Sequence, residues 1–322
     1  MKRITICLAL AALSFAQSNH SVTKADVDRD MKELSNWGRW GKDDQLGAFN
    51  LITDSIRKQA MASVKEGVSV SLAHDLDKEK SLDNTTPFIQ RMGPTGPTTA
   101  GPWTVDSYNF PAYHGWAITH LDALCHMSYE GKMYNGFSTS ELDQTGAHKL
   151  AVGNLKGGIV SRGVLVDIAR LKGVPYLEPE TPIYPEDLEA WEKMAHVKIG
   201  KGDIVFIRTG RWARRAEKGS WQLEGHAAGL HESCARWLKN RDIAMLGSDG
   251  VQDVMPSQVP GVVEPIHQLM LVAMGVGLFD NCDLEAVGAA CAQRKRWTFL
   301  LTASPLAVRE GTGSPINPLA IF

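Results

Sequence analysis

The feature that most constrains the fold is a set of apolar runs, rich in Val and Ile, that show little alternation with polar residues. The runs at 158–168 (GIVSRGVLVDI) and 202–208 (GDIVFIR) predict strands, because continuously apolar strands are typical of a sheet covered on both faces. The mixture of strands and helices along the chain predicts one α/β domain with a mixed sheet flanked by helices. Further strands are expected at 68–74, 243–249 and 296–306, and helices at 52–67, 185–195, 229–240 and 264–275.

The N-terminal residues 1–16 have a different character, with a basic start, an apolar core and small residues near Ala16. This pattern predicts a secretory signal peptide cleaved after Ala16, and the apolar stretch is too short for a comfortable membrane span. We therefore expect an exported protein, periplasmic or secreted, that is not attached to the membrane after cleavage. Residues 17–35 are expected to form a polar, weakly ordered lead-in to a domain spanning 36–322.

The composition excludes some partners. The formal net charge is −2, and Lys and Arg are spread along the chain, so the sequence shows no basic footprint for nucleic acid. The five cysteines include no CxxC pair, which argues against a cysteine zinc site. The stretch 75–112 is rich in Pro, Gly, Thr and Asn, and we expect a long loop that covers a site or makes a subunit contact.

Three of the ten histidines lie within HGWAITHLDALCH, residues 114–126. Polar groups set in an apolar run are expected to be buried, and buried polar groups need a partner. His120 and Asp122 are two residues apart, so in an extended segment they point to the same face and form half of a divalent-metal site. His126 lies four residues beyond Asp122, where a neutral imidazole is placed to transfer protons.

Other ligands must come from further along the chain, because two protein ligands alone would hold a metal loosely. Two candidate sources are His267, on an expected helix, and Asp280, just after it. The spacing alone does not choose among the candidates, and histidines satisfied by backbone hydrogen bonds in a core are the alternative. The other possible ligands are Glu264, Glu285, His226 and His231.

The segment THLDALCH (119–126) resembles the T-H-x-D-x-x-x-H signature of the cyclase-like metal-dependent hydrolases, a family that includes bacterial kynurenine formamidase and isatin hydrolase. The similarity extends from about residue 40 to about residue 310. It includes WGKDDQLGAFNLIT (40–53), GKMYNG (131–136), GIVSRGVLVDIAR (158–170), GDIVFIRTGRW (202–212), LGSD (246–249) and the segment from His267 to Asp280.

The resemblance implies a swivelling β/β/α-type fold, usually in a homo-oligomer. It also implies a divalent metal, zinc or manganese, with one or two ions bound by His120 and Asp122 and completed by His267 and Asp280. The histidine that ends the motif, His126, takes the proton-transfer role. Metal-activated water then attacks the carbonyl of an amide, lactam or lactone.

The sequence departs from the family pattern at four positions. Trp116 replaces a histidine of the signature, Ile118 a glycine, Leu124 a proline and Asp280 a glutamate. These changes indicate a remodelled metal shell, in which either His114 reaches in through a two-residue bulge or one ion binds instead of two.

The leading hypothesis is an exported metal-dependent hydrolase that opens a cyclic amide, a lactone or a related small carbonyl compound. A flat substrate would stack on Trp116, and Arg162 would bind a substrate carboxylate. One alternative is a non-catalytic small-molecule-binding protein in which Trp116 has closed the metal site. A second is a hydrolase that uses Cys125 with His126 or His120, although adjacent residues of an extended segment face opposite ways.

Overall fold

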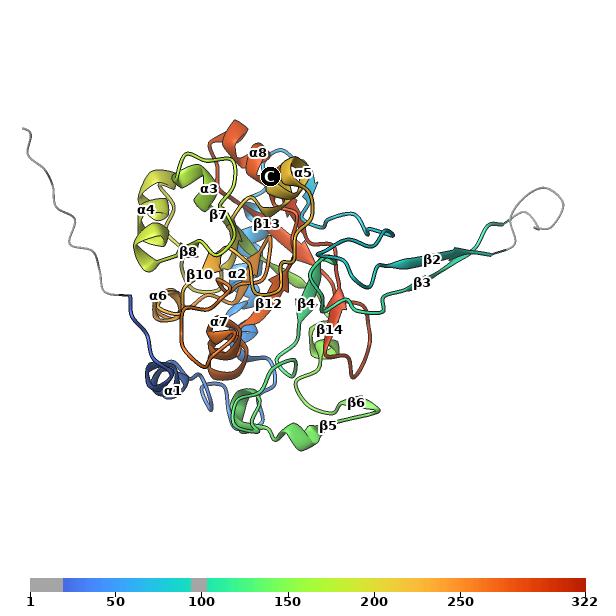
Figure 1. Ribbon diagram of the computed structural model, residues 1–322. Coiled ribbons are helices and arrows are strands. Elements are labelled where there is room, and N and C mark those ends of the chain that lie inside the picture. Colours follow the sequence, from blue (N-terminus) through green and yellow to red (C-terminus); the bar gives the residue numbers. More distant parts are fainter. Residues whose placement is uncertain (1–19, 94–102) are drawn as a thin grey trace, which may run out of the picture.

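A nine-stranded mixed sheet organises the fold in the computed structural model, which describes residues 20–93 and 103–322 (Figure 1). The signal peptide expected at 1–16 lies outside the described residues. The strands run across the sheet in the order β1 (Ser69–Ser71), β15 (Leu319–Ile321), β13 (Thr298–Ala303), β7 (Ile159–Asp167), β9 (Ile204–Arg208), β11 (Met245–Ser248), β12 (Gly277–Asp280), β4 (His120–Asp122) and β14 (Gly313–Pro315).

The centre of the sheet is parallel, from β7 through β9 and β11 to β12, and the outer strands pair antiparallel. The central strands are the Val- and Ile-rich runs, and β11 is buried along its whole length. All five strands expected from the sequence are present, with shorter ends, and the predicted mixed α/β fold is confirmed. The short strands β4, β12 and β14 lack such runs and were not predicted.

Helices pack around this sheet. Helix α2 (Asp54–Ala62) lies against β7 and β13, and α8 (Glu285–Arg294) against β1 and β7. The remaining helices of the body are α3 (Ile168–Leu171), α4 (Pro185–Ala195), α5 (Arg211–Lys218), α6 (Cys234–Arg241) and α7 (Pro265–His267), which continues into the π-helical segment η5 (Gln268–Met274). The helix expected at 264–275 is thus partly π-helical, and it packs against β12.

Helix α1 (Lys24–Glu33) occupies part of the segment that was expected to be a weakly ordered lead-in. Thr23 and Asp26 form a reciprocal capping box at its start. Val27 and Met31, spaced by one helical turn, are buried where the helix contacts η5. Residues 24–33 are therefore an ordered part of the domain, because two apolar side chains are enough to dock this mainly polar helix.

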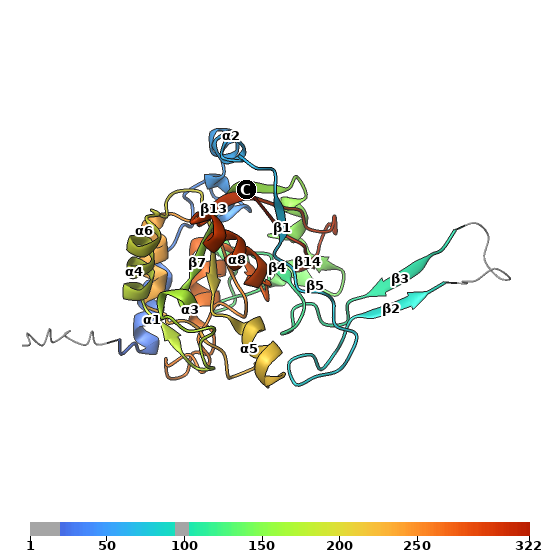
Figure 2. The same ribbon diagram turned by 90° about the horizontal axis from the view of Figure 1, so that it is seen from above.

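The segment 75–112 also differs from the expected loop. It contains an antiparallel hairpin formed by β2 (Ile89–Met92) and β3 (Asp106–Asn109), which projects away from the body (Figures 1 and 2). All four residues of β3 are exposed. In the described residues, the hairpin points outward instead of covering the sheet.

No helix in the described ranges is long and apolar enough to cross a membrane. Several short helical turns and strands complete the fold. These elements are η1 (Gly47–Leu51), η2 (Tyr134–Gly136), η3 (Thr139–Glu141), η4 (Val152–Leu155), β5 (Leu142–Asp143), β6 (Gly146–Ala147), β8 (Pro182–Ile183) and β10 (Gly229–Leu230).

Candidate metal centre

Strand β4 places the two central residues of the motif. His120 and Asp122 are the first and last residues of the strand, so their side chains share one face, and both are buried. β4 lies between β12 and β14, which pairs His120 with Asp280 on one side and Asp122 with Gly313 on the other. The sheet register therefore brings together residues that are about 160 positions apart in sequence.

Four side chains converge beside β4. The Nε2 atom of His120 lies 3.5 Å from Oδ1 of Asp122 and 3.9 Å from Oδ2 of Asp280. The Nε2 atom of His267 lies 3.4 Å from Oδ2 of Asp280 and 4.0 Å from Oδ2 of Asp122. Donors bonded at about 2.1 Å to one ion lie roughly 3 to 3.5 Å apart. The separations of 3.4 and 3.5 Å fall in this range, and those of 3.9 and 4.0 Å would have to shorten by about half an ångström around a divalent cation.

The imidazoles of His120 and His267 are both oriented by a hydrogen bond at Nδ1. Nδ1 of His120 donates to the carbonyl oxygen of Ile118 at 2.8 Å, since a carbonyl can only accept. Nδ1 of His267 is 2.7 Å from Oδ2 of Asp253. These bonds leave the Nε2 atoms of His120 and His267 facing the cluster, which is the arrangement that metal-binding histidines require.

Two further histidines lie on the other side of Asp122. Nδ1 of His114 is 2.8 Å from Oδ1 of Asp122, and its Nε2 is 3.0 Å from Oγ1 of Thr312. The rings of His114 and His126 stack at 4.0 Å, and Nε2 of His126 lies 4.0 Å from Oδ2 of Asp122. Gly313 makes this possible, because a Cβ there would lie 2.7 Å from the His114 ring. Asp122 is thus shared by two groups of possible ligands.

The surrounding charges set the ionisation of the site. Burial acts to raise the pKa of Asp122, but the charges of His120 and His126 overcome this and hold that pKa well below its usual range. Burial lowers the pKa of His126, and the attraction of Asp122 only partly opposes it. Asp122 is therefore an anion, while His126 tends to be neutral near pH 7, a state in which it can accept a proton.

A groove of about 620 Å³ adjoins this cluster. Trp116, two residues after His114, lines one part of it, and Glu264, three residues before His267, lines another. The charge of Glu264 interacts with those of His267 and Asp122. The groove therefore extends to the segments that carry the candidate ligands, although none of the ligands themselves lines it.

Arg162 lies elsewhere. Arg162 is near the start of β7, whereas Asp280 is the last residue of β12. The register of the parallel strands therefore puts Arg162 at their amino ends and Asp280 at their carboxyl ends. Its guanidinium forms a two-pronged ion pair with Asp203, with bonds of 2.7 and 2.5 Å. The structure therefore does not bring Arg162 to the cluster.

Three of the alternative ligands considered from the sequence also have partners away from the cluster: His226, His231 and Glu285. His226 lies 2.6 Å from Glu180, and Glu285 pairs with Arg208 at 2.6 Å. Asp249, the last residue of the LGSD segment, accepts backbone hydrogen bonds from Gly210 and Arg211 at the start of α5. His231 lies 2.9 Å from the hydroxyl of Ser233.

Cys125 is a poor nucleophile in this setting. Its side chain is buried, and burial raises the pKa of its thiol to about 12. The four cysteines in the described part of the chain are free and buried. The geometry thus favours the metal hypothesis over the Cys–His alternative, because the thiolate is the reactive form.

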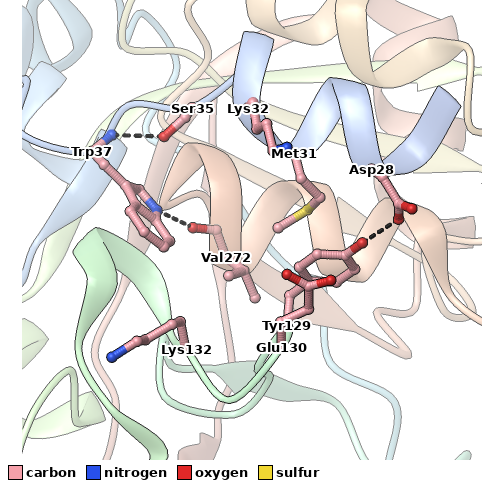
Figure 3. A pocket seen from close by; sticks show the side chains of 9 residues that line it. All are labelled: Asp28, Met31, Lys32, Ser35, Trp37, Tyr129, Glu130, Lys132 and Val272. Atoms are coloured by element: carbon pink, nitrogen blue, oxygen red, sulfur yellow. Dashed lines mark hydrogen bonds between the residues drawn. The ribbon is translucent and has the colours of Figure 1, made fainter. Parts of the chain in front are cut away.

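A second cavity, of about 480 Å³, lies between α1 and the turn at 129–132 (Figure 3). Trp37 borders it and donates its indole N–H to the carbonyl of Val272 at 2.7 Å, while the Tyr129 hydroxyl donates to Asp28. None of the candidate metal ligands lines this cavity. The residues around this cavity connect α1 to the rest of the domain.

Sequence reasoning missed three supporting residues. Asp253 orients His267, Thr312 contacts His114, and Gln252 donates to Oδ1 of Asp280 at 2.6 Å. Asp253 and Gln252 lie in the loop after β11, and no spacing pattern relates them to the motif. Only the folded chain brings them to the cluster.

A curled mixed sheet with a buried group of histidines and aspartates at one edge defines an α/β protein with the fold of the cyclase-type hydrolases. The model of the family described as putative cyclase matches residues 70–252, more than half of the chain, and the chain belongs to this family. A crystal structure described as a novel cyclase is 30% identical, covers 91% of this chain and 99% of its own, and superposes with a TM-score of 0.80.

Isatin hydrolases are among the relatives. The enzyme of Roseibium aggregatum is 28% identical over 151 residues, which are 45% of this chain and 54% of the relative, so the match spans about half of that relative's length. Isatin hydrolase A from Labrenzia aggregata, solved with benzyl benzoate, has a TM-score of 0.58 at 20% identity and covers 82% of this chain and 98% of its own. This second likeness concerns the fold alone. The predicted family is confirmed.

Proposed function

We propose that the protein is an exported metal-dependent hydrolase that opens a cyclic amide, a lactone or a related small carbonyl compound. The observation that carries the proposal is the convergence of His120, Asp122, His267 and Asp280, with both imidazole Nε2 atoms turned inward. Two imidazoles and two carboxylates are a donor set that zinc and manganese both accept.

A divalent ion held by these four residues would act as a Lewis acid that polarises a carbonyl and lowers the pKa of water. The chain supplies the orientation of the ligands through Asp253 and Ile118. Asp122, together with His114 and His126, offers a second position on the other side, so one or two ions would fit.

Proton transfer falls to His126. Its side chain is 30% exposed, so it reaches the solvent-facing side of the cluster, whereas His120 is 2% exposed. When one ion is bound at the His120 side, the neutral ring of His126 could accept a proton at Nε2 from the attacking water and return it to the leaving nitrogen or oxygen, because burial lowers its pKa. With a second ion on the His114 side, His126 would serve as a ligand instead. The stacked His114 ring, held by Asp122 and Thr312, keeps the His126 ring in place.

The groove beside the cluster would hold the substrate. Trp116 offers a flat surface against which an aromatic ring can stack. The isatin hydrolases among the relatives act on such a fused-ring compound, as their names state, and isatin is therefore a reasonable first test substrate.

Two parts of the proposal rest on the sequence. Export is supported by the basic and apolar pattern of residues 1–16. A homo-oligomer is supported by the family resemblance. We expect no nucleic-acid partner, since the net charge is −2 and no basic cluster dominates the chain.

The decisive experiment is elemental analysis of the protein purified without added metal, alongside His120→Ala and Asp122→Ala. We expect about one or two zinc or manganese ions per chain in the native protein and loss of metal and of isatin hydrolysis in both variants. His148→Ala and Asp143→Ala are matched controls, because they remove an exposed imidazole and carboxylate that pair at 2.9 Å elsewhere.

A native protein that contains no metal and takes up neither zinc nor manganese would overturn the proposal. A binding role without catalysis would then be the better hypothesis.

A further inference from the structure

The groove beside the metal centre has an unusual distribution of charge. Its walls are mainly apolar, and its charged lining residues are Glu224 and Glu264. Among the described residues, the lining contains no lysine, arginine or histidine. Among the side chains that line the groove, an anion would meet two carboxylates and no cationic group.

The two glutamates lie at different depths. Glu264 is half-buried and directly precedes α7, the helix that ends at His267. In the described part of the chain its carboxylate has no hydrogen-bond or ion-pair partner, and burial raises its pKa. Glu224 is exposed on the rim and has no side-chain partner among the described residues.

Hydrogen bonds fix the backbone around Trp116, which lines another part of the groove. The carbonyl of Trp116 accepts a hydrogen bond from Arg211, and the carbonyl of Gly115 accepts one from Asn281 at 2.8 Å. Asn281 directly follows Asp280. The backbone at Gly115 and Trp116 is therefore anchored, and a ring stacked on Trp116 would share the groove with the two glutamates.

We propose that Glu224 and Glu264 make the groove select neutral or cationic apolar substrates and reject anionic ones. This inference rests on the proposed function. Hydrolysis adds a water molecule across the C–N or C–O bond, so the carbonyl carbon gains a hydroxyl and the leaving nitrogen or oxygen gains a proton. The acid that forms loses its proton to become a carboxylate, and the same glutamates then favour its release.

The size of the effect follows from Coulomb's law. A unit charge several ångströms from a partly exposed carboxylate gains or loses on the order of 1 kcal/mol, which is about a three- to tenfold change in affinity. Because Glu224 is exposed, salt screens its share of the effect. A purely steric preference would not depend on salt.

The test uses three probes of one shape: dihydrocoumarin, which is a neutral aryl lactone, and derivatives that carry a carboxylate or an aminomethyl group on the same ring. Dissociation constants are measured by calorimetry and kcat/KM by absorbance, on zinc-loaded wild type, Glu224→Gln and Glu224→Lys. Each variant is compared with wild type on the same compound, so differences in intrinsic reactivity cancel. Glu189→Lys is the matched control, since Glu189 is an exposed glutamate on α4.

The bound zinc attracts the carboxylate probe equally in wild type and in the variants, so the effect of Glu224 is measured as the change in the ratio of carboxylate to neutral affinity. We expect Glu224→Gln to raise this ratio about three- to tenfold and Glu224→Lys to raise it further. About 0.5 M salt should reduce the difference between each variant and wild type. Glu189→Lys should leave the ratio unchanged. No binding of any probe, or an unchanged ratio in Glu224→Lys, would overturn the inference.

The outcome is separable from that of the proposed function. If affinity depends on the charge of the probe but no probe is hydrolysed, the result would contradict the proposed hydrolase function alone. If the probes are hydrolysed but their affinities do not depend on charge, the result would contradict the proposed selectivity alone.

Discussion

The chemistry of single residues at the centre depends on which nitrogen of each imidazole carries the hydrogen. For His267 this is decided by Asp253, which accepts hydrogen bonds from Nδ1 of His267 and from the backbone N–H groups of Ile266 and His267. Asp253 therefore fixes both the ring and the start of α7. A residue that contacts no substrate can thus control metal affinity.

Replacing this carboxylate with an amide should weaken metal binding. In Asp253→Asn, one of the acceptor oxygens becomes a donor, so the Nδ1 bond and the backbone bonds can no longer all form. We expect the affinity for zinc to fall about 10- to 100-fold, measured by competition with a chromophoric chelator. Asp143→Asn, at an exposed site, should bind zinc as wild type does, and equal affinities in the two variants would contradict the role of Asp253.

The thiol of Cys125 should be dispensable. Because burial raises its pKa to about 12, little thiolate exists at neutral pH, and Cys125→Ala should keep kcat/KM within about threefold of wild type. A loss of more than about 100-fold, with zinc content and melting temperature unchanged, would restore the Cys–His alternative.

The functional residues of β4 could be predicted from the sequence, because the two-residue spacing of His120 and Asp122 and the polarity of the segment are properties of neighbouring residues. His120 and Asp122 share a face because they are two residues apart in an extended segment, and His267 lies on a helical segment as expected. Asp253, Gln252 and the constraint at Gly313 were not predictable, because each depends on which strands become neighbours. Local patterns carry no information about that register.

Among the elements, α1 shows how little apolar surface is needed to order a segment. Its sequence is mostly charged, and only Val27 and Met31 supply a continuous apolar face of buried side chains. That face packs on η5, the π-helical continuation of the helix that bears His267. The helix is therefore joined to the element behind the metal centre.

Truncating the buried face should destabilise the domain. Val27 has no exposed surface, so Val27→Ala should lower the free energy of unfolding by about 1 to 3 kcal/mol in urea titrations. Lys32→Ala, on the exposed side of the same helix, should change it by less than about 0.5 kcal/mol. Equal, small effects would show that α1 is detached in solution.

The stability of the whole molecule should depend on pH through Glu232. This residue lies two positions before α6 and is 3% exposed, and burial, reinforced by the charges of Asp30 and Asp26 on α1, raises its pKa to about 7. The usual value is 4.5, so between these values the folded state binds more protons than the unfolded state. Stability from this group is therefore highest in acid and falls as the pH rises towards 7.

Glu232→Gln should remove this dependence. We expect the variant to unfold at a higher temperature than wild type at about pH 8, with the difference shrinking as the pH falls to about 4.5. Melting curves by circular dichroism over this range provide the test. Parallel curves for the two proteins would show that Glu232 keeps its ordinary pKa.

The sharing of Asp122 limits how ions in this protein can be counted. Since one carboxylate belongs to both groups of possible ligands, a substitution at position 122 would be expected to empty both positions together, and the loss of metal would give only their total occupancy. Stoichiometry has to be assigned from the outer members: Asp280 belongs to one group alone, and His126 to the other. A titration that fills in two stages in wild type, and in one stage in each of those outer variants, would be the signature of two ions joined through a common oxygen ligand.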